Sequence, residues 1–231
     1  INPGDFNKMY KYETHLHTKH GSACATISGK GQALEYKHAG YTGIIVTEHF
    51  FRGNTCIPKD LPWEERINLF CRGYEEAKYY GDKIGLQVFF GWEETYDGQD
   101  FLVYGLDKEW LLNHPEVEHW TIKEQFLEVS KYGGMVIHAH PFRDRPYIPK
   151  IRLFPKQVHG VEVYNAGNYN EENERAYMYA KQYNLPITAG GDSHHHDITC
   201  SGIGVEERFE SIVDYIKCIK ENKPKQLLYI N

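Results

Sequence analysis

Two histidines with a single residue between them are the first sign of chemistry in this chain. In the segment THLH, His15 and His17 would point to the same side of a strand, because side chains alternate along a strand. Two imidazole nitrogens would then face one metal ion. So short a motif is about as often a pair of ordinary core or surface histidines, and the rest of the chain must decide.

Acids and histidines also end later apolar runs. Glu48 and His49 follow one such run, and Glu93 and Glu94 follow the next. Taken singly, each would be read as a structural histidine or a solvated acid. A carboxylate such as Glu93 can, however, bridge two metal ions held roughly 3.5 to 4 Å apart.

The segments HAHPFR and GGDSHHH extend the pattern. His140 precedes a proline that ends its strand, and Arg143 offers a planar fork that matches phosphate oxygens, although an ordinary surface arginine is nearly as common. Asp192 and His194 stand two residues apart after a glycine pair and are the best candidates in their segment. The two histidines that follow them are expected to be bystanders or outer contacts of a site.

The mixture of imidazoles and carboxylates favours Zn, Mn, Fe or another borderline ion over a structural zinc knot or a calcium cage. The cysteines are odd in number, widely spaced and without a CxxC pair, so a disulfide framework is not expected and a reducing cytoplasm fits best. They are Cys24, Cys56, Cys71, Cys200 and Cys218.

Elements that could position these residues follow from apolar periodicity. Strands and helices alternate, which predicts an α/β fold of parallel strands joined by helical crossovers, with the strands' carboxyl ends converging on one face. Strands are expected at 11–16, 43–47, 86–92, 101–106, 135–138, 161–164, 187–189 and 226–230, and helices at 32–38, 63–80, 121–132, 171–183 and 211–221.

The length and the net charge of the chain limit the functions that it can have. The 231 residues are expected to form a single hydrolase domain, 1–231, and the formal charge of −6 argues against binding of long nucleic acid. No apolar run is long enough to span a bilayer, and no signal segment is recognised at the start of the sequence. A cytoplasmic enzyme acting on a small anionic substrate remains compatible.

In order, the motifs HLH, TEH, GWEE, HAHPFR and GGDSHH resemble those of the polymerase and histidinol phosphatase (PHP) family. The resemblance implies a distorted (β/α)7 barrel, similar to a TIM barrel, that binds two or three divalent transition-metal ions and hydrolyses phosphoesters. It further implies a first metal held by His15, His17, Glu93 and Asp192, a second held by Glu93 and His140, and a third held by His49 and His194.

This chain departs from the family's pattern at three places. Glu48 stands where the family usually has Asp, and Asp100 stands where it often has His; we assign Asp100 to the second metal. Shortly after the HxH motif the family commonly places Asp or His for the third metal. Here the segment KHGSAC leaves three alternatives open: His20 serves as the ligand, Cys24 serves, or the third ion binds weakly.

The hypothesis is a phosphoesterase in which a metal-activated water attacks a small phosphomonoester or a nucleotide. Asp192 would be essential, His194 or His196 would donate a proton to the leaving group, and Arg143 would clamp the non-transferred oxygens. Glu162 and Asn165 are outer contacts, substrate contacts or structural residues. The competing readings are an amidohydrolase-like hydrolase, although no lysine is evident at a strand end, and a non-catalytic metal-binding PHP domain.

Overall fold

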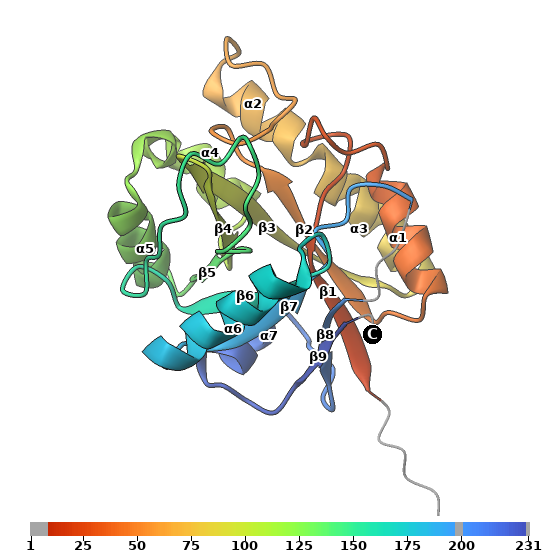
Figure 1. The fold of residues 1–231 in the computed structure, drawn as a ribbon. Helices are drawn as coiled ribbons and strands as arrows, with labels where there is room; N and C mark the ends of the chain where they lie inside the picture. Colours follow the sequence, from red (N-terminus) through yellow and green to blue (C-terminus); the bar gives the residue numbers. More distant parts are fainter. Residues whose placement is uncertain (1–8, 197–200, 230–231) are drawn as a thin grey trace, which may run out of the picture.

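The computed structural model describes residues 9–196 and 201–229. Within them, one curved sheet has the strand order β7-β6-β5-β4-β3-β2-β1-β8-β9. Helices lie outside the sheet, with α1 and α3 on the flank opposite α5 (Figure 1). The strands are β1 (Tyr10–Leu16), β2 (Gly43–His49), β3 (Gln87–Tyr96), β4 (Gln99–Tyr104), β5 (Met135–His138), β6 (Gly160–Asn165), β7 (Ile187–Gly190), β8 (Gly202–Val205) and β9 (Gln226–Leu228).

Several helices begin where the sequence offers a capping side chain. Ser28, Thr121 and Ser211 each accept a backbone N–H of the first turn, and the last two form capping boxes. The helices are α1 (Gly29–His38), α2 (Trp63–Phe70), α3 (Arg72–Ile84), α4 (Lys108–Asn113), η1 (Pro115–His119), α5 (Ile122–Lys131), α6 (Asn170–Tyr183) and α7 (Ile212–Lys220). The single helix expected at 63–80 is therefore two, separated at Cys71, and α4, η1 and β8 were not expected.

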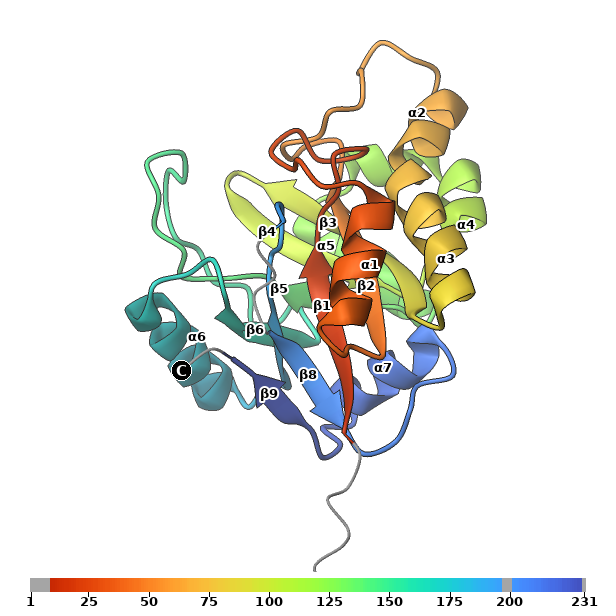
Figure 2. The same ribbon diagram turned by 90° about the vertical axis from the view of Figure 1, so that its right-hand side faces the viewer.

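The two ends of the β7-to-β1 part of the sheet meet and nearly close a barrel. Beyond β7, Ser193 forms a parallel bridge with Leu16, and the His17 N–H donates to the Ser193 carbonyl at 2.9 Å. Gly190 permits this approach, since a Cβ there would lie 2.5 Å from the Cβ of His15. Strands β8 and β9 continue the sheet past β1, with β9 on the side of α6 (Figure 2). The expected distorted, TIM-like barrel is confirmed.

The expectation of an all-parallel sheet is wrong in two regions. Strand β4 runs antiparallel to both β3 and β5, and β8 runs antiparallel to β1 and β9. Asp97 and Gly98 join β3 to β4 with φ values of 49° and 79°. An Asp-Gly pair with two positive φ angles is the preferred turn of a tight hairpin, so this dipeptide was the overlooked signal.

Buried apolar residues fill the barrel and the layer between sheet and helices. At the barrel end away from the carboxyl ends of β1 and β2, α7 places Tyr215 against Tyr104, at a ring-centroid distance of 5.1 Å. None of the described helices combines the length and apolar content that a membrane crossing requires. Cys200 and Ile230, which belong to the expectations above, lie outside the described residues.

Candidate metal centre

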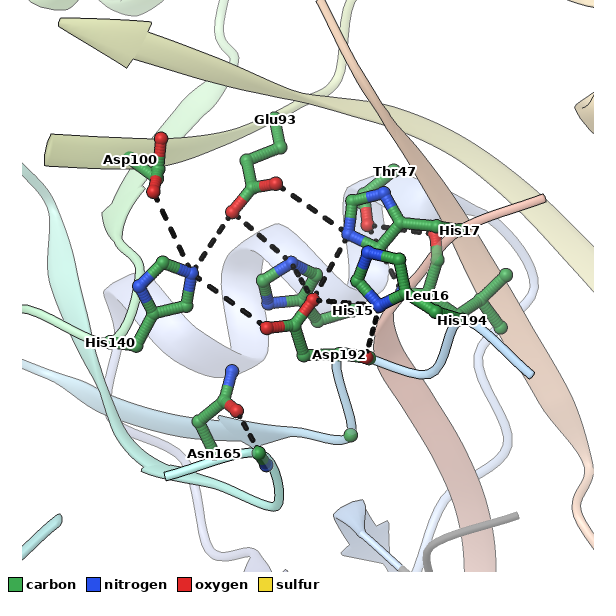
Figure 3. A network of polar contacts seen from close by, with 12 residues as sticks. His15, Leu16, His17, Thr47, Glu93, Asp100, His140, Asn165, Asp192 and His194 are labelled. Atoms are coloured by element: carbon green, nitrogen blue, oxygen red, sulfur yellow. Dashed lines mark hydrogen bonds and ion pairs between the residues drawn. The ribbon is translucent and has the colours of Figure 1, made fainter. Parts of the chain in front are cut away.

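The acids and histidines of separate motifs come together at the carboxyl ends of the central strands. Figure 3 shows Glu93 and Asp192 facing each other, with His140 at one side and His17 at the other. Parallel strands and the turns that follow them carry all but Asp100, which joins the others from the amino end of the antiparallel strand β4, so the convergence is a result of the barrel. The residues that meet are His15, His17, His49, Glu93, Asp100, His140, Asp192 and His194.

Glu93 lies at the centre of this cluster and divides it into two halves. Its Oε1 lies 3.1 Å from His140 Nε2 and 3.3 Å from His15 Nε2. Its Oε2 lies 2.6 Å from His49 Nδ1 and 3.5 Å from His17 Nε2. Each oxygen thus faces a different pair of imidazoles.

Asp192 approaches the same histidines from the opposite side. Its Oδ1 lies 3.2 Å from His17 Nε2 and 3.4 Å from His15 Nε2, and its Oδ2 lies 2.7 Å from Arg143 Nη1. The backbone of Asp192 is in the left-handed region at φ 53°, and His140 is there too at φ 27°. Such conformations are uncommon outside glycine and gather at functional sites.

Glu162 fixes the orientation of His15 from outside the cluster. Its Oε1 accepts from His15 Nδ1 at 2.9 Å, and its Oε2 accepts from the backbone N–H of His140 at 3.0 Å. Because Nδ1 carries the proton, the lone pair of His15 Nε2 points into the cluster. A carboxylate behind an imidazole is the usual support of a metal-binding histidine. Of the alternatives open for Glu162, the structure favours this outer contact.

Ser22 and Glu48 fix the orientation of the His17 ring. The Ser22 hydroxyl donates to Glu48 Oε2 at 2.7 Å, so it must accept from His17 Nδ1 at 3.0 Å, and it also accepts from the His49 N–H at 3.1 Å. Glu48 further accepts from the Thr18 N–H at 3.0 Å. Burial raises the pKa of Glu48 to about 7 against these hydrogen bonds. Sequence reasoning missed Ser22, because nothing marks a loop serine as the support of a distant ring.

Several buried atoms of the cluster have no hydrogen-bond partner among the described protein atoms. They are His15 Nε2, His17 Nε2, Glu93 Oε2 and Asp192 Oδ1, and all four face the space between the two carboxylates. Buried polar atoms without partners are rare and costly. Nitrogen lone pairs and carboxylate oxygens aimed at one space form the donor set of a divalent transition-metal ion, so these residues fit such ions.

The cluster is also strongly coupled electrostatically. Burial raises the pKa of Glu93, but His49 and His15 outweigh it and hold that pKa well below its usual range. Burial likewise opposes ionisation of Asp192, but His15 and Arg143 hold its pKa well below the usual range. Both acids are therefore carboxylates at neutral pH, the form that binds cations.

The remaining expected ligands differ in how closely they approach. Asp100 Oδ2 lies 4.0 Å from His140 Nε2, and Asp100 Oδ1 accepts from the Thr95 hydroxyl at 2.6 Å. His194 Nε2 lies 3.5 Å from His49 Nε2. Asp100 and His194 therefore reach the cluster at its two edges.

Two expected participants lie elsewhere. His20 pairs with Glu76 on α3, Nε2 to Oε2 at 3.1 Å, and is not among the groups of potential ligands in the described residues. Its loop turns the ring away from the barrel axis, and Cys24 lies in the pocket instead. His196 is exposed and pairs with Glu35 of α1, so of the two alternatives for a proton donor only His194 lies at the cluster.

A pocket of about 790 Å³ opens over the cluster. Arg52, Tyr147 and His195 line it in addition to the residues above. Glu94, the neighbour of Glu93, points away and pairs with Arg52 Nε at 3.2 Å. The volume is that of a small-molecule site.

Comparison with known proteins supports the same assignment. The family model PHP_C, described as PHP-associated, matches residues 170–197, which include α6, β7 and the GGDSHHH segment. Among curated proteins, none matches the sequence significantly.

Solved structures share the fold at low sequence identity. A two-domain protein from Bacteroides vulgatus, containing a predicted PHP-like metal-dependent phosphoesterase, has a TM-score of 0.73 and 18% identity over 96% of this chain. This chain spans 65% of the length of that protein. A candidate metal-dependent phosphoesterase from Bifidobacterium adolescentis has a TM-score of 0.58 and 16% identity, over 90% of this chain and 96% of that one.

An amidohydrolase from Chromobacterium violaceum, with bound sulfate and no metal, is also similar. It has a TM-score of 0.52 and 12% identity, over 80% of this chain and 88% of that one. At these identities the likeness concerns the fold. Together with the ordered motifs of the sequence, the matched segment and the shared fold confirm the resemblance to the PHP family.

Proposed function

We propose that this chain is a metal-dependent phosphoesterase that hydrolyses a small phosphomonoester or a nucleotide. The observation that carries the proposal is the position of Glu93, whose two oxygens face different imidazole pairs. That geometry suits two or three ions in one pocket. The fold shared with PHP-like proteins supports the same conclusion.

The residues that would hold the ions follow from the contacts. His15, His17, Asp192 and Glu93 would hold the first ion. Glu93, His140 and Asp100 would hold the second, and His49 and His194 would hold the third. Bound Zn, Mn or Fe would supply Lewis acidity, which lowers the pKa of water and neutralises phosphate oxygens. Glu162, Ser22 and Glu48 would keep the ring lone pairs directed at these positions.

Arg143 would serve the substrate as well as the site. Three of its five N–H donors are engaged, by Asp192, Asn165 and Asn168. Burial opposes its charge, but Asp192 dominates and raises the pKa of Arg143 further, so the guanidinium stays protonated. The two remaining donors would bind a phosphate oxygen in the pocket. The contacts with Asp192, Asn165 and Asn168 would hold the guanidinium in place.

An amidohydrolase-like reaction is the second candidate, favoured by the similarity to the Chromobacterium violaceum protein. Both reactions need the same kind of metal site. None of the described residues that line the pocket is a lysine, which distinguishes it from sites built around a central lysine. A substrate panel that contains phosphomonoesters, nucleotides and amides separates the two candidates.

The test is elemental analysis of the untagged protein combined with turnover of p-nitrophenyl phosphate before and after chelation. We expect two or three transition-metal ions per chain, and turnover that chelation removes and Mn or Zn restores. Turnover of amides alone would favour the amidohydrolase. Bound metal without turnover on the whole panel would favour a non-catalytic metal-binding domain and contradict the proposal.

A further inference from the structure

We propose that Tyr147 determines substrate specificity, because its ring stacks on a planar ring carried by the alcohol part of the substrate. The inference rests on the proposed function, since it assumes that the pocket over the metal centre binds a phosphoester. It deepens that function by naming a substrate class: phosphoesters whose leaving group contains an aromatic ring, in preference to those with a purely aliphatic alcohol.

Tyr147 lies at the mouth of the pocket. Its side chain lines the same pocket as Asp100, His140 and Arg143, yet the residue is 72% exposed. The metal centre lies at the closed side, where Glu93 is fully buried. A phosphate bound there would therefore direct its leaving group towards the open side and Tyr147. The loop after β5, which carries Tyr147, projects at the same end of the barrel as the β3–β4 hairpin (Figure 2).

A tight turn presents the ring. Pro146 and Tyr147 are its central residues, and the Ile148 N–H donates to the Arg145 carbonyl at 2.9 Å. Proline at the first central position fixes φ and suits such a turn. The backbone that carries the ring is therefore set before any ligand binds.

The turn is anchored on both sides. Before it, Arg145 Nη1 donates to Glu172 Oε1 of α6 at 2.6 Å. After it, the Lys150 carbonyl accepts from Gln99 Nε2 at 3.1 Å. Gln99 directly precedes Asp100 in β4, so the turn is tied to the strand that reaches the metal centre. A ring held in this way loses little freedom when a ligand stacks on it, which favours binding.

Small residues form part of the same pocket wall, namely Gly98, Ala166 and Gly167. A Cβ at Gly167 would lie 3.2 Å from Arg143 Nη2. Gly98 has a φ of 79°, which side chains rarely adopt. Both positions therefore exclude larger side chains, and the wall near Tyr147 leaves room for a flat group of the substrate.

Tyr147 also differs from exposed tyrosines outside the pocket. Tyr169 has the guanidinium of Arg145 over its ring at 4.5 Å, and Tyr229 contacts another tyrosine ring at 5.7 Å between centroids. Within the described part of the chain, the side chain of Tyr147 has no hydrogen bond and no ring contact. Tyr177 on the outer face of α6 shares this lack of contacts but is not a pocket residue, so it offers a matched control.

An open aromatic face at a pocket mouth favours planar groups. Aromatic rings stack on one another with a gain beyond buried area, and an aliphatic alcohol such as glycerol has no face to offer. Stacking on the leaving group exists in the bound substrate as well as in the transition state. Its loss should therefore raise KM and leave kcat nearly constant.

The experiment measures kcat and KM of the full chain, loaded with metal, for phenyl phosphate, adenosine monophosphate and glycerol phosphate. Tyr147→Ala should lower kcat/KM by roughly 5- to 100-fold for at least one of the two substrates with a ring, through KM. The value for glycerol phosphate should change by less than about twofold. Comparing each substrate with itself removes differences in leaving-group reactivity. Tyr147→Phe and the control Tyr177→Ala should stay within about twofold of the wild type.

The two ring-bearing substrates separate two sources of the same chemistry. A loss confined to phenyl phosphate places the recognised ring on the ester oxygen, and one confined to adenosine monophosphate places it a sugar away. An equal loss on all three substrates, no loss on any, or the same loss in Tyr147→Phe would overturn the role of the ring and leave the proposed function standing. A metal-loaded wild type that hydrolyses none of the three would overturn both.

Discussion

Two segments of this chain have the same HxH pattern but use it differently. In the first, His15 and His17 both face Glu93 and Asp192. In the second, His140 faces Glu93, whereas its companion His138 stacks on Phe101 in the core, at a centroid distance of 4.8 Å and 10° between the planes. The shared spacing therefore predicts two ligands in one case and one in the other.

The difference lies in the backbone and in the contacts behind each ring. Strand β5 ends at His138, and the positive φ of His140 breaks the alternation that would have put both rings on one side. Behind His15 stands the carboxylate of Glu162, whereas neither ring nitrogen of His138 has a described partner. Burial lowers the pKa of His138 to about 3, so it is neutral. An outer acceptor marks a ligand better than spacing does.

The largest effect is expected at Asp192, which both rings of the first segment face. Asp192→Asn removes the charge that pairs with His15, His17 and Arg143, so turnover should fall by roughly 10³-fold, the upper range for one preorganised group. Phosphatase assays with elemental analysis measure this, and circular dichroism monitors the fold. Asp97→Asn, at an exposed acid of the hairpin, is the control. Full activity of Asp192→Asn would contradict the assignment of Asp192 as an essential residue of the metal centre.

The comparison itself is tested by changing the second segment at each histidine. His140→Ala should reduce turnover by about 10²-fold and lower the metal content, because it removes a ligand. His138→Leu should leave both within about twofold and keep or raise the melting temperature, since it replaces two unpaired buried nitrogens by apolar atoms. Loss of metal from His138→Leu would show that the two segments are equivalent after all.

A smaller effect on metal binding is expected from Glu162, which supports His15 of the first segment. Glu162→Gln weakens the acceptor of His15 Nδ1 and leaves an amide beside the His140 N–H, so metal affinity should fall by about 10- to 100-fold. Titration of the stripped protein with Zn measures the change. Glu172→Gln, at an acid that pairs with Arg145 outside the cluster, provides the matched control. Unchanged affinity in Glu162→Gln would mean that His15 needs no outer support.

The smallest effect concerns His159, a second structural histidine beside β5. Burial and Lys220 lower the pKa of His159 to about 4, and its Nδ1 accepts from the Val136 N–H at 3.0 Å. The unfolded chain, with a pKa near the ordinary 6.5, binds the proton first as the pH falls. The free energy of unfolding should therefore drop between pH 6.5 and 4, by at most about 1.4 kcal/mol per pH unit from this group.

Replacing this ring by an acceptor that does not titrate isolates its contribution. His159→Asn should show a flatter dependence of unfolding free energy on pH over the same interval, measured by urea denaturation at several pH values. Equal slopes for the variant and the wild type would show that His159 is protonated in the folded protein. The metal content should be the same in both.

The order of the motifs was enough to predict the family resemblance, the barrel and the approach of residues far apart in the sequence. Apolar runs that end in His, Glu or Asp predict this because parallel strands carry their carboxyl ends to one face. The sequence could not place His20, His138 or Ser22. Where a ring points depends on the backbone angle at the end of its strand, and what supports it depends on side chains that only folding brings near.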